Sequence, residues 1–387
     1  MTRFHPLFAL GLLLASLATP MLAESVVVTL RAPDGVELKA TYTAAEKPGP
    51  GVLLLHMCNS DRSAWQGLAA KLAVRGIHSL ALDYRGYGDS GGTLPDGPGR
   101  GLLIDETWPG DIDTAFEYLR SRPEVHAQRL GAAGGSCGVD NAVDLARRHP
   151  GEVKTLVLLA GTTDRDGEAF LAENAWLPVL ASASRDDGQA VELTRWTLGF
   201  SSHPANRFLE YETGGHGTEM FAVHDQLEPS IAGWFLEHLI RNPARKSVVA
   251  KSEPGPSIKL WNALTEPDGV ARVTEGLQQA RARGKAIPLP PEGVINAEGY
   301  RLLGAGDLDQ AIELLGFNVE AFPESANALD SLSDAYLANG QRQKALALAQ
   351  QALEALPNDT ALSDDFRRAV EESARRKLAE AAAAGTE

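Results

Sequence analysis

The apolar residues between positions 25 and 240 form short continuous runs, and segments with a helical pattern separate these runs. A short apolar run between turn signals is typical of a strand that is buried on both faces. The strand-like runs cover residues 51–56, 77–82, 129–133, 153–160, 177–183 and 207–212. The helical patterns cover residues 65–75, 111–120, 139–148 and 231–240. This alternation predicts an α/β fold with a mostly parallel sheet flanked by helices.

Two further features complete the expected layout of this first domain. Residues 25–31 and 36–43 alternate between apolar and polar positions around a Pro-Asp-Gly turn, which predicts a β-hairpin. The composition changes after Asn242, where residues 248–256 form a polar run rich in charged residues, Ser, Gly and Pro. We therefore expect an α/β domain over residues 24–245 and a linker over residues 246–258.

The first 23 residues have the pattern of an export signal. Arg3 supplies a positive charge, residues 7–17 form an apolar core, and small Ala23 ends the segment. We expect cleavage after Ala23, with Ala18 as the second choice, and a periplasmic or secreted protein. The alternative is a retained membrane anchor, but the apolar run is shorter than the roughly 20 residues of a bilayer span. No membrane span is expected after cleavage.

The C-terminal part contains residues that recur with a spacing of 34. The recurring pairs are Gly306 and Gly340, Ala311 and Ala345, and Pro323 and Pro357. This spacing resembles that of tetratricopeptide repeats, in which glycine lies at a helix turn and proline at the exit. The resemblance implies an all-α domain of helical hairpins over residues 259–380. Because two repeats seldom form a stable stack, we expect the helices at 268–283 and beyond Asp364 to complete or cap it.

Composition and charge limit the kinds of partner. The 387 residues are 44% hydrophobic and 22% charged, as in globular domains. The formal net charge of −15 argues against a nucleic-acid partner, because phosphates require a basic surface. The sequence contains neither a metal-ligand spacing nor a phosphate-binding loop, so we expect no metal and no cofactor.

Candidate chemistry lies at residues 134–138, which read Gly-Gly-Ser-Cys-Gly. This G-x-S-x-G pattern separates a strand-like run from a helical pattern. A serine at such a turn projects its hydroxyl above the sheet, and the glycines prevent steric clashes with the turn. Ser136 is therefore the candidate nucleophile. Cys137 is an alternative nucleophile, but the glycine spacing does not fit it. By itself the pentapeptide is weak evidence, because it also occurs by chance.

Several segments together carry a family resemblance. Residues 52–56, Trp65 and residues 76–90, followed by the serine turn, look like the N-terminal half of an α/β-hydrolase. The resemblance covers roughly residues 25–240. It is closest to the dienelactone-hydrolase-like and esterase-like members, because no long insertion separates the strands near Val153 and Leu177.

The resemblance implies a triad in the chain order serine, acid, histidine. His216 lies in a glycine-rich loop after the last predicted strand and matches the position of the base. The acid is expected after the strand that ends near Ala183, where Asp186 and Asp187 are adjacent. The spacing of the family favours Asp186. Asp187 remains the alternative, since it also suits the cap of the following helix.

The resemblance also assigns two backbone donors for an oxyanion. One is the N–H of Cys137, and the other is that of Cys58 in the loop after the strand ending at His56. Met57 stands where the family usually has glycine, which puts the conformation of this loop in question. Because both cysteines occupy positions whose backbones must approach one point, the resemblance implies a Cys58–Cys137 disulfide in an oxidising compartment. The alternative is two buried free thiols.

The sequence thus predicts an exported serine hydrolase that cleaves a small ester or related acyl substrate through an acyl-enzyme. The repeat region would bind a protein partner, mediate self-association or only brace the hydrolase. The alternative is a catalytically impaired hydrolase-fold scaffold that binds a partner through its repeats.

Overall fold

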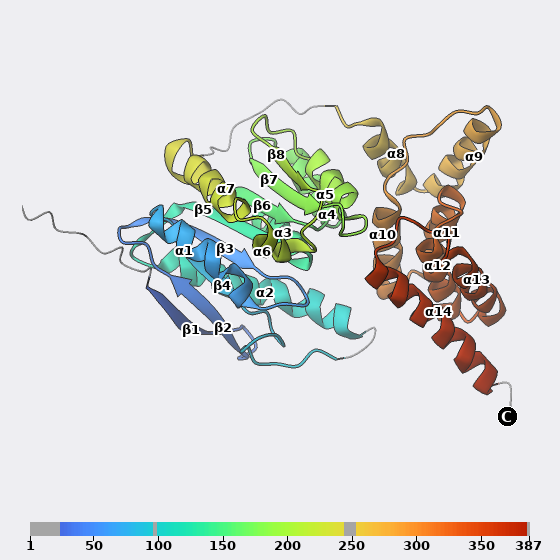
Figure 1. Ribbon diagram of the computed structural model, residues 1–387, viewed down its shortest axis with the longest axis horizontal. Coiled ribbons are helices and arrows are strands. Elements are labelled where there is room, and N and C mark those ends of the chain that lie inside the picture. Colours follow the sequence, from blue (N-terminus) through green and yellow to red (C-terminus); the bar gives the residue numbers. More distant parts are fainter. Residues whose placement is uncertain (1–23, 96–98, 244–252, 385–387) are drawn as a thin grey trace, which may run out of the picture.

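The computed structural model describes residues 24–95, 99–243 and 253–384, which form a sheet domain and an all-helical domain (Figure 1). The strands are β1 Ser25–Arg31, β2 Glu37–Thr43, β3 Gly49–Leu55, β4 His78–Leu82, β5 Val125–Gly135, β6 Val153–Leu159, β7 Val179–Ser184 and β8 Arg207–Tyr211. They form one eight-stranded sheet in the order β1-β2-β4-β3-β5-β6-β7-β8. The hairpin β1–β2 joins the sheet antiparallel to β4, and the other pairs are parallel. The predicted fold class is confirmed.

Helices cover both faces of this sheet, as the continuous apolar strands require. The helices of the sheet domain are α1 Gln66–Val74, α2 Gly99–Ser121, α3 Cys137–Arg148, α4 Arg165–Glu173, α5 Ala190–Gly199, α6 Met220–Val223 and α7 Leu227–Leu236. Helices α1 and α7 pack with Val52 and Leu54 of β3 on one face. Helices α2 and α3 pack with Leu53 and Leu55 of the same strand on the other face. Alternate residues of β3 therefore serve two separate cores.

The helical domain consists of paired helices. They are α8 Pro256–Leu264, α9 Gly269–Ala282, α10 Glu292–Ala305, α11 Leu308–Ala321, α12 Ala326–Ala338, α13 Arg342–Ala355 and α14 Asp364–Ala384. Gly306 and Gly340 have φ values of 83° and 72° in the turns after α10 and α12, a conformation that glycine adopts at low cost. Ala311 and Ala345 are buried where the helices touch. Helix α8 begins within the segment expected as a linker.

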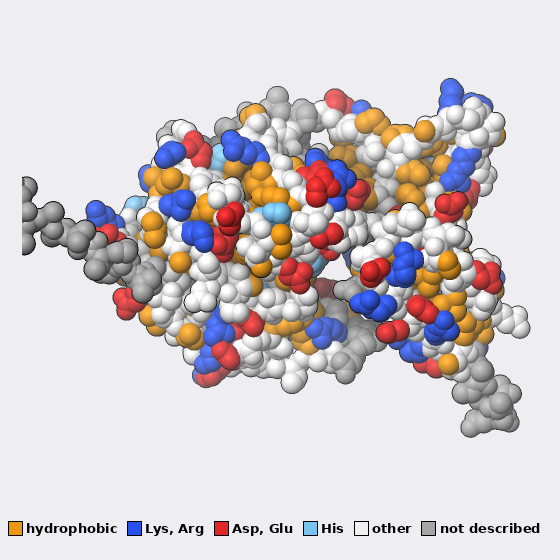
Figure 2. All heavy atoms as spheres, viewed as in Figure 1, with side chains coloured by type: hydrophobic (Ala, Val, Ile, Leu, Met, Phe, Trp, Pro, Cys, Tyr) orange, Lys and Arg blue, Asp and Glu red, His pale blue; other side chains and the backbone are white. Residues whose placement is uncertain are grey.

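The helical domain packs beside the ends of the sheet that carry α4 and α5 (Figure 1). In the space-filling view, the surface is hollowed between the two domains (Figure 2). No helix in the described part of the chain is long and apolar enough to cross a bilayer. The predicted signal segment 1–23 lies outside the described residues.

Candidate active site

Ser136 occupies a sharp turn between β5 and α3. Its φ and ψ of 52° and −121° lie in a region that non-glycine residues rarely adopt. The turn is closely packed: a Cβ on Gly134 would lie 1.8 Å from the carbonyl oxygen of Gly138, and one on Gly138 would lie 2.5 Å from that of Leu55. The Ser136 N–H is held by the carbonyl of Leu159 at 2.8 Å. The glycines are therefore a steric requirement of this strained turn.

His216 lies in the loop after β8 and is paired with an acid. Its Nδ1 is 2.6 Å from Oδ2 of Asp187, which follows β7. This hydrogen bond raises the pKa of His216, and burial opposes it in part. Ser136, Asp187 and His216 line one cavity. No hydrogen bond joins the Ser136 hydroxyl to the imidazole among the described contacts, and in structures without substrate such bonds are often long.

The structure places Asp187, the alternative, against His216, and Asp186, which the spacing favoured, against the neighbouring backbone. The Asp186 carboxylate accepts hydrogen bonds from the N–H groups of Gly214 at 3.0 Å and Gly215 at 3.2 Å. Burial raises the pKa of Asp186, but the hydrogen bonds outweigh it and leave the pKa below its usual value. Asp186 therefore holds the loop that carries His216, while its neighbour Asp187 reaches the imidazole.

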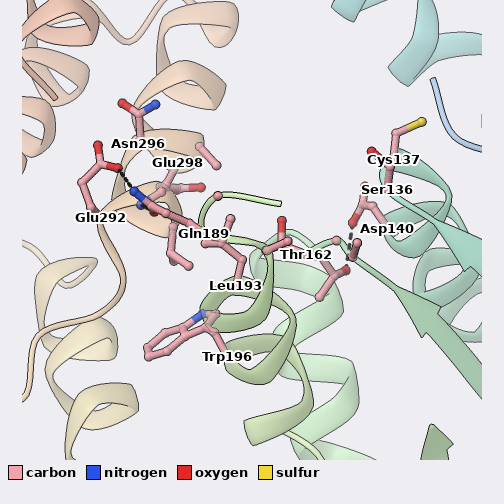
Figure 3. Close-up of a pocket in the computed structure, with 18 of the residues that line it drawn as sticks. Ser136, Cys137, Asp140, Thr162, Gln189, Leu193, Trp196, Glu292, Asn296 and Glu298 are labelled. Atoms are coloured by element: carbon pink, nitrogen blue, oxygen red, sulfur yellow. Dashed lines mark hydrogen bonds between the residues drawn. The ribbon is translucent and has the colours of Figure 1, made fainter. Parts of the chain in front are cut away.

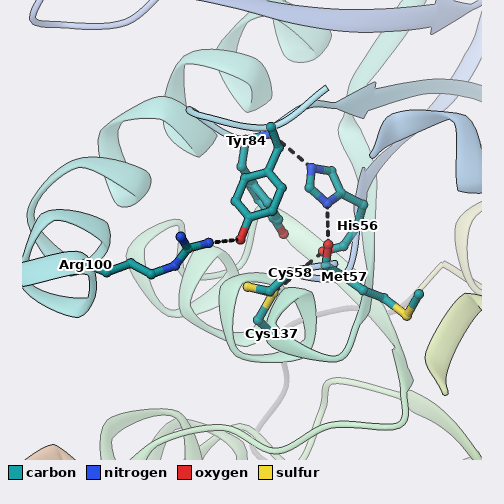
Figure 4. The surroundings of a disulfide bond; sticks show 7 residues. His56, Met57, Cys58, Tyr84, Arg100 and Cys137 are labelled. Carbon is teal, nitrogen blue, oxygen red and sulfur yellow. Dashed lines mark hydrogen bonds between the residues drawn. A yellow bond between two sulfur atoms is a disulfide. The ribbon is translucent and has the colours of Figure 1, made fainter. Parts of the chain in front are cut away.

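The two expected oxyanion donors are tied together by a disulfide (Figure 4). Cys137 is the first residue of α3 and Cys58 lies in the loop after β3; their Cα atoms are 5.9 Å apart. Neither backbone N–H donates a hydrogen bond to another group in the described part of the chain. Both donors are therefore free for a ligand oxygen. The expected Cys58–Cys137 bond is present.

Buried His56 fixes the direction of the Cys58 N–H. Its Nδ1 contacts the Met57 carbonyl oxygen at 2.6 Å, and its Nε2 accepts the Tyr84 N–H at 3.1 Å. Burial lowers the pKa of His56, which favours the neutral ring with the proton on Nδ1. In a trans peptide the carbonyl and the following N–H point in opposite directions. Holding the Met57 carbonyl therefore orients the N–H of Cys58.

Met57 fits the loop although the family usually has glycine at this position. Its side chain is 3% exposed and extends away from the disulfide (Figure 4). The Met57 sulfur accepts the Thr218 N–H at 3.4 Å, and a Cβ on Gly217 would lie 2.4 Å from that sulfur. Met57 therefore packs against the turn that follows His216 and leaves Cys58 unobstructed.

Two tryptophans near the site are packing residues. Trp65 is fully buried between α1 and the sheet. Trp108 is 1% exposed and stacks on Tyr84 with ring centroids 4.2 Å apart. Among the described residues, no group of three His, Cys, Asp or Glu side chains is arranged to hold a metal ion.

Two family models match the chain. The model described as serine aminopeptidase, S33, matches residues 46–186, which include the turn at Ser136, and a tetratricopeptide-repeat model matches residues 302–364. The first domain is an α/β-hydrolase, and the second contains tetratricopeptide repeats. The sequence resemblance is thereby confirmed for both the hydrolase domain and the repeat domain.

The relatives in sequence are uncharacterized proteins. One is YfhR of Salmonella typhimurium, 33% identical over 130 residues, or 32% of this chain and 41% of the relative. Another is a Mycobacterium tuberculosis protein, 32% identical over 155 residues, or 39% of this chain and 50% of the relative. The chain thus spans about half or less of the length of these relatives.

Solved structures with a similar fold include two hydrolases. The Pyrococcus furiosus esterase Pf2001 has 18% identity and a TM-score of 0.46, with 56% of this chain and 92% of that chain covered. The dienelactone hydrolase from Anabaena variabilis has 17% identity and a TM-score of 0.44, with 58% of this chain and all of that chain covered.

The candidate site opens into a cavity of about 550 Å³ that both domains line (Figure 3). The hydrolase domain contributes Ser136, Thr162 and Leu193, among others. The repeat domain contributes Glu292 and Asn296 of α10, and Phe366 of α14. Sequence analysis missed this second wall, because the repeat period describes how helices stack and not which face meets another domain.

Proposed function

We propose that this protein is a serine hydrolase that cleaves a small ester or related acyl bond through Ser136, His216 and Asp187. The observation that carries the proposal is the strained Ser136 in one cavity with an imidazole paired to a carboxylate. A hydroxyl is a weak nucleophile until a neutral imidazole accepts its proton, and a carboxylate at Nδ1 selects the useful tautomer.

The reaction would proceed in two halves. The Ser136 oxygen forms a bond to the acyl carbon while His216 takes the serine proton. The bond to the leaving group then breaks, and His216 donates that proton to the leaving alcohol, amine or thiol. In the second half, water attacks the acyl carbon while His216 takes the water proton. The bond to the Ser136 oxygen then breaks, His216 returns the proton to Ser136, and the acid is released. The free N–H groups of Cys58 and Cys137 would stabilise the oxyanion, and removing one such donor typically costs about 10²- to 10³-fold in rate.

The same observations bear on the scaffold alternative and on location. A scaffold needs neither a His–Asp pair nor two free donors beside a strained serine, so these features favour turnover.

Export is proposed from the signal pattern of residues 1–23, and the Cys58–Cys137 bond is consistent with an oxidising compartment. Partner binding by the repeats stays a prediction.

The direct test is labelling of the full chain with a fluorophosphonate probe. We expect wild-type protein to be labelled and Ser136→Ala to be unlabelled, whereas Ser121→Ala, at an exposed serine at the end of α2, keeps wild-type labelling. Folded wild-type protein that resists the probe would rule the proposal out. Turnover of p-nitrophenyl esters and of aminoacyl anilides then separates ester from amide hydrolysis.

A further inference from the structure

The repeat domain reaches the candidate active site at the first turn of α10. Figure 3 shows Glu292, Asn296 and Glu298 of this helix across the cavity from Ser136, with Gln189 between the two sides. The cavity volume of about 550 Å³ is that of a site for a drug-sized ligand. It is far larger than an acetyl group requires. A substrate with a longer chain would extend from Ser136 across the cavity and contact the repeat domain.

A polar clamp joins the acid loop to α10. Gln189 follows Asp187 by two positions, at the N-terminal cap of α5. Its amide nitrogen donates to Oε2 of Glu292 at 2.9 Å, and its amide oxygen accepts the N–H of Gly293 at 3.1 Å. Both polar atoms of one side chain are therefore engaged by the repeat domain. The N–H of Gly293 is one of the helix-start donors that need a partner outside the helix.

The other end of the clamp is anchored inside the repeat domain. Glu292 is 6% exposed, and its Oε1 accepts from the side-chain amides of Asn327 at 3.0 Å and Asn318 at 3.3 Å. These asparagines belong to α12 and α11. The Glu292 carboxylate, which binds Gln189, is thus fixed by α10, α11 and α12 of the repeat domain. Burial raises the pKa of Glu292, and these hydrogen bonds oppose the shift.

We propose that the repeat domain is a working part of the active site: α10 forms the substrate wall opposite Ser136, and Gln189 is a positioning residue for the loop that carries Asp187. The proposal rests on the proposed hydrolase function and adds a substrate class. The preferred substrate has an acyl chain of medium length, in place of a short acetyl group, and this chain contacts Val294 and Ala297, the apolar side chains that α10 contributes to the cavity.

The wall is tested by filling the cavity from the α10 side. Ala297 is exposed and lines the cavity, whereas Ala305 is exposed on the last turn of the same helix and does not line it. With Ala297→Trp, we expect kcat/KM for p-nitrophenyl octanoate to fall at least about tenfold, the loss of about 1.4 kcal/mol of contact. Turnover of p-nitrophenyl acetate should change far less, and Ala305→Trp should change neither. Equal losses of kcat/KM for both esters would overturn the proposal that α10 forms a substrate wall.

The clamp is tested by exchanging its two partners. Gln189→Glu places a carboxylate against that of Glu292, and we expect kcat to fall at least about tenfold, because small displacements of catalytic groups are costly. In the double variant Gln189→Glu/Glu292→Gln, the new amide nitrogen at position 292 donates to the new carboxylate, and its oxygen still accepts from Asn318 and Asn327. Every hydrogen bond of the clamp is restored, so kcat should recover.

A neutral variant gives a readout that packing alone would not move. Gln189→Ala removes the clamp without adding charge. Asp187 should then hold His216 less firmly, so the pKa of His216 should fall. The acidic limb of kcat/KM, which His216 sets, should therefore shift to lower pH. Thermal melts confirm that each variant is folded. An active wild type whose kcat and pH profile are unaffected by Gln189→Ala, or a double variant without rescue, would overturn the clamp and leave the hydrolase standing. An inactive, unlabelled wild type would instead overturn the proposed function.

Discussion

At the scale of single residues, the neighbouring aspartates 186 and 187 have separate tasks. Asp187→Asn would present the wrong partner to Nδ1 of His216 and favour the wrong tautomer, so we expect kcat to fall by about 10⁴-fold. Asp186→Asn keeps only one of the two oxygens that accept from the N–H groups of Gly214 and Gly215, but it leaves the partner of His216 in place and should cost much less. Steady-state kinetics on both variants decide the assignment, and a larger loss in Asp186→Asn would reverse it.

The pH dependence of the reaction is also a property of one residue. The imidazole of His216 accepts a proton only when neutral, so kcat/KM should fall as the pH drops through the pKa of His216. The hydrogen bond that His216 donates to Asp187 raises this pKa, which places the acidic limb above the usual histidine value. Asp187→Asn should move the limb to lower pH. A limb at the same pH in both proteins would show that another group controls it.

The sequence indicated one candidate serine, Ser136, and one candidate histidine, His216, but two candidate acids. The local geometry explains this difference. A serine elbow and a glycine-rich histidine loop have local steric requirements that the residue types reveal. Asp186 and Asp187 are both short carboxylates in a turn after β7, where no periodicity fixes which side chain faces the imidazole. Only the placement of the Gly214–Gly215 backbone, which captures Asp186, decides between them.

At the scale of elements, the disulfide joins the loop after β3 to the start of α3. The two cysteines are 79 positions apart, and closing a loop of this length stabilises a fold by up to about 4 kcal/mol on the chain-entropy account. We expect Cys58→Ser/Cys137→Ser to lose much of this free energy of unfolding in urea titrations. The variant should also lose kcat, because the two oxyanion donors are no longer held together.

Reductant provides the control for this prediction. Reduced wild-type protein should resemble the double cysteine variant in both stability and kcat, and reductant should leave the variant unchanged. If the variant is as stable and as active as oxidised wild type, the bond has no part in holding the site.

Helix α2 shows where pattern reading fails for an element. The sequence predicted a helix from Asp111, but α2 begins at Gly99 and contains Pro109. Proline normally ends or kinks a helix because it lacks an N–H and its ring clashes with the preceding turn. Helix α2 nevertheless continues through Pro109, and Arg148 of α3 donates to the Pro109 carbonyl at 3.3 Å, which ties this turn of α2 to α3. A tertiary contact of this kind has no signature in the local sequence.

At the scale of the whole molecule, the docking of the two domains is what the sequence did not reveal. The apolar pattern gave the sheet, and the 34-residue spacing gave the helical stack, because both are local regularities. The contact of Gln189 with Glu292 joins positions from different domains, and neither pattern extends across the linker. At this junction Glu292 is buried and Gln189 is partly buried, and only the packing of the two domains explains why polar residues lie there.

The second junction, at Glu168, tests whether docking is needed for function. This carboxylate is 3% exposed and accepts from the indole N–H groups of Trp196 in the hydrolase domain and Trp261 in α8, each at 2.8 Å. Removing either donor leaves part of a buried carboxylate unsatisfied, at a cost of about 1–3 kcal/mol. Trp261→Phe and Trp196→Phe are therefore a matched pair.

The two variants differ in whether the lost hydrogen bond lies within one domain or between the two domains. Both should lower the unfolding temperature, but only Trp261→Phe removes a bond between domains. We expect faster amide hydrogen exchange in α8 and at the start of α10, and a selective loss of turnover of long-chain esters. Trp196→Phe should leave both properties closer to wild type. If the two variants have the same exchange pattern and ester preference, the Glu168 junction only stabilises the fold, and the wall opposite Ser136 depends on other contacts.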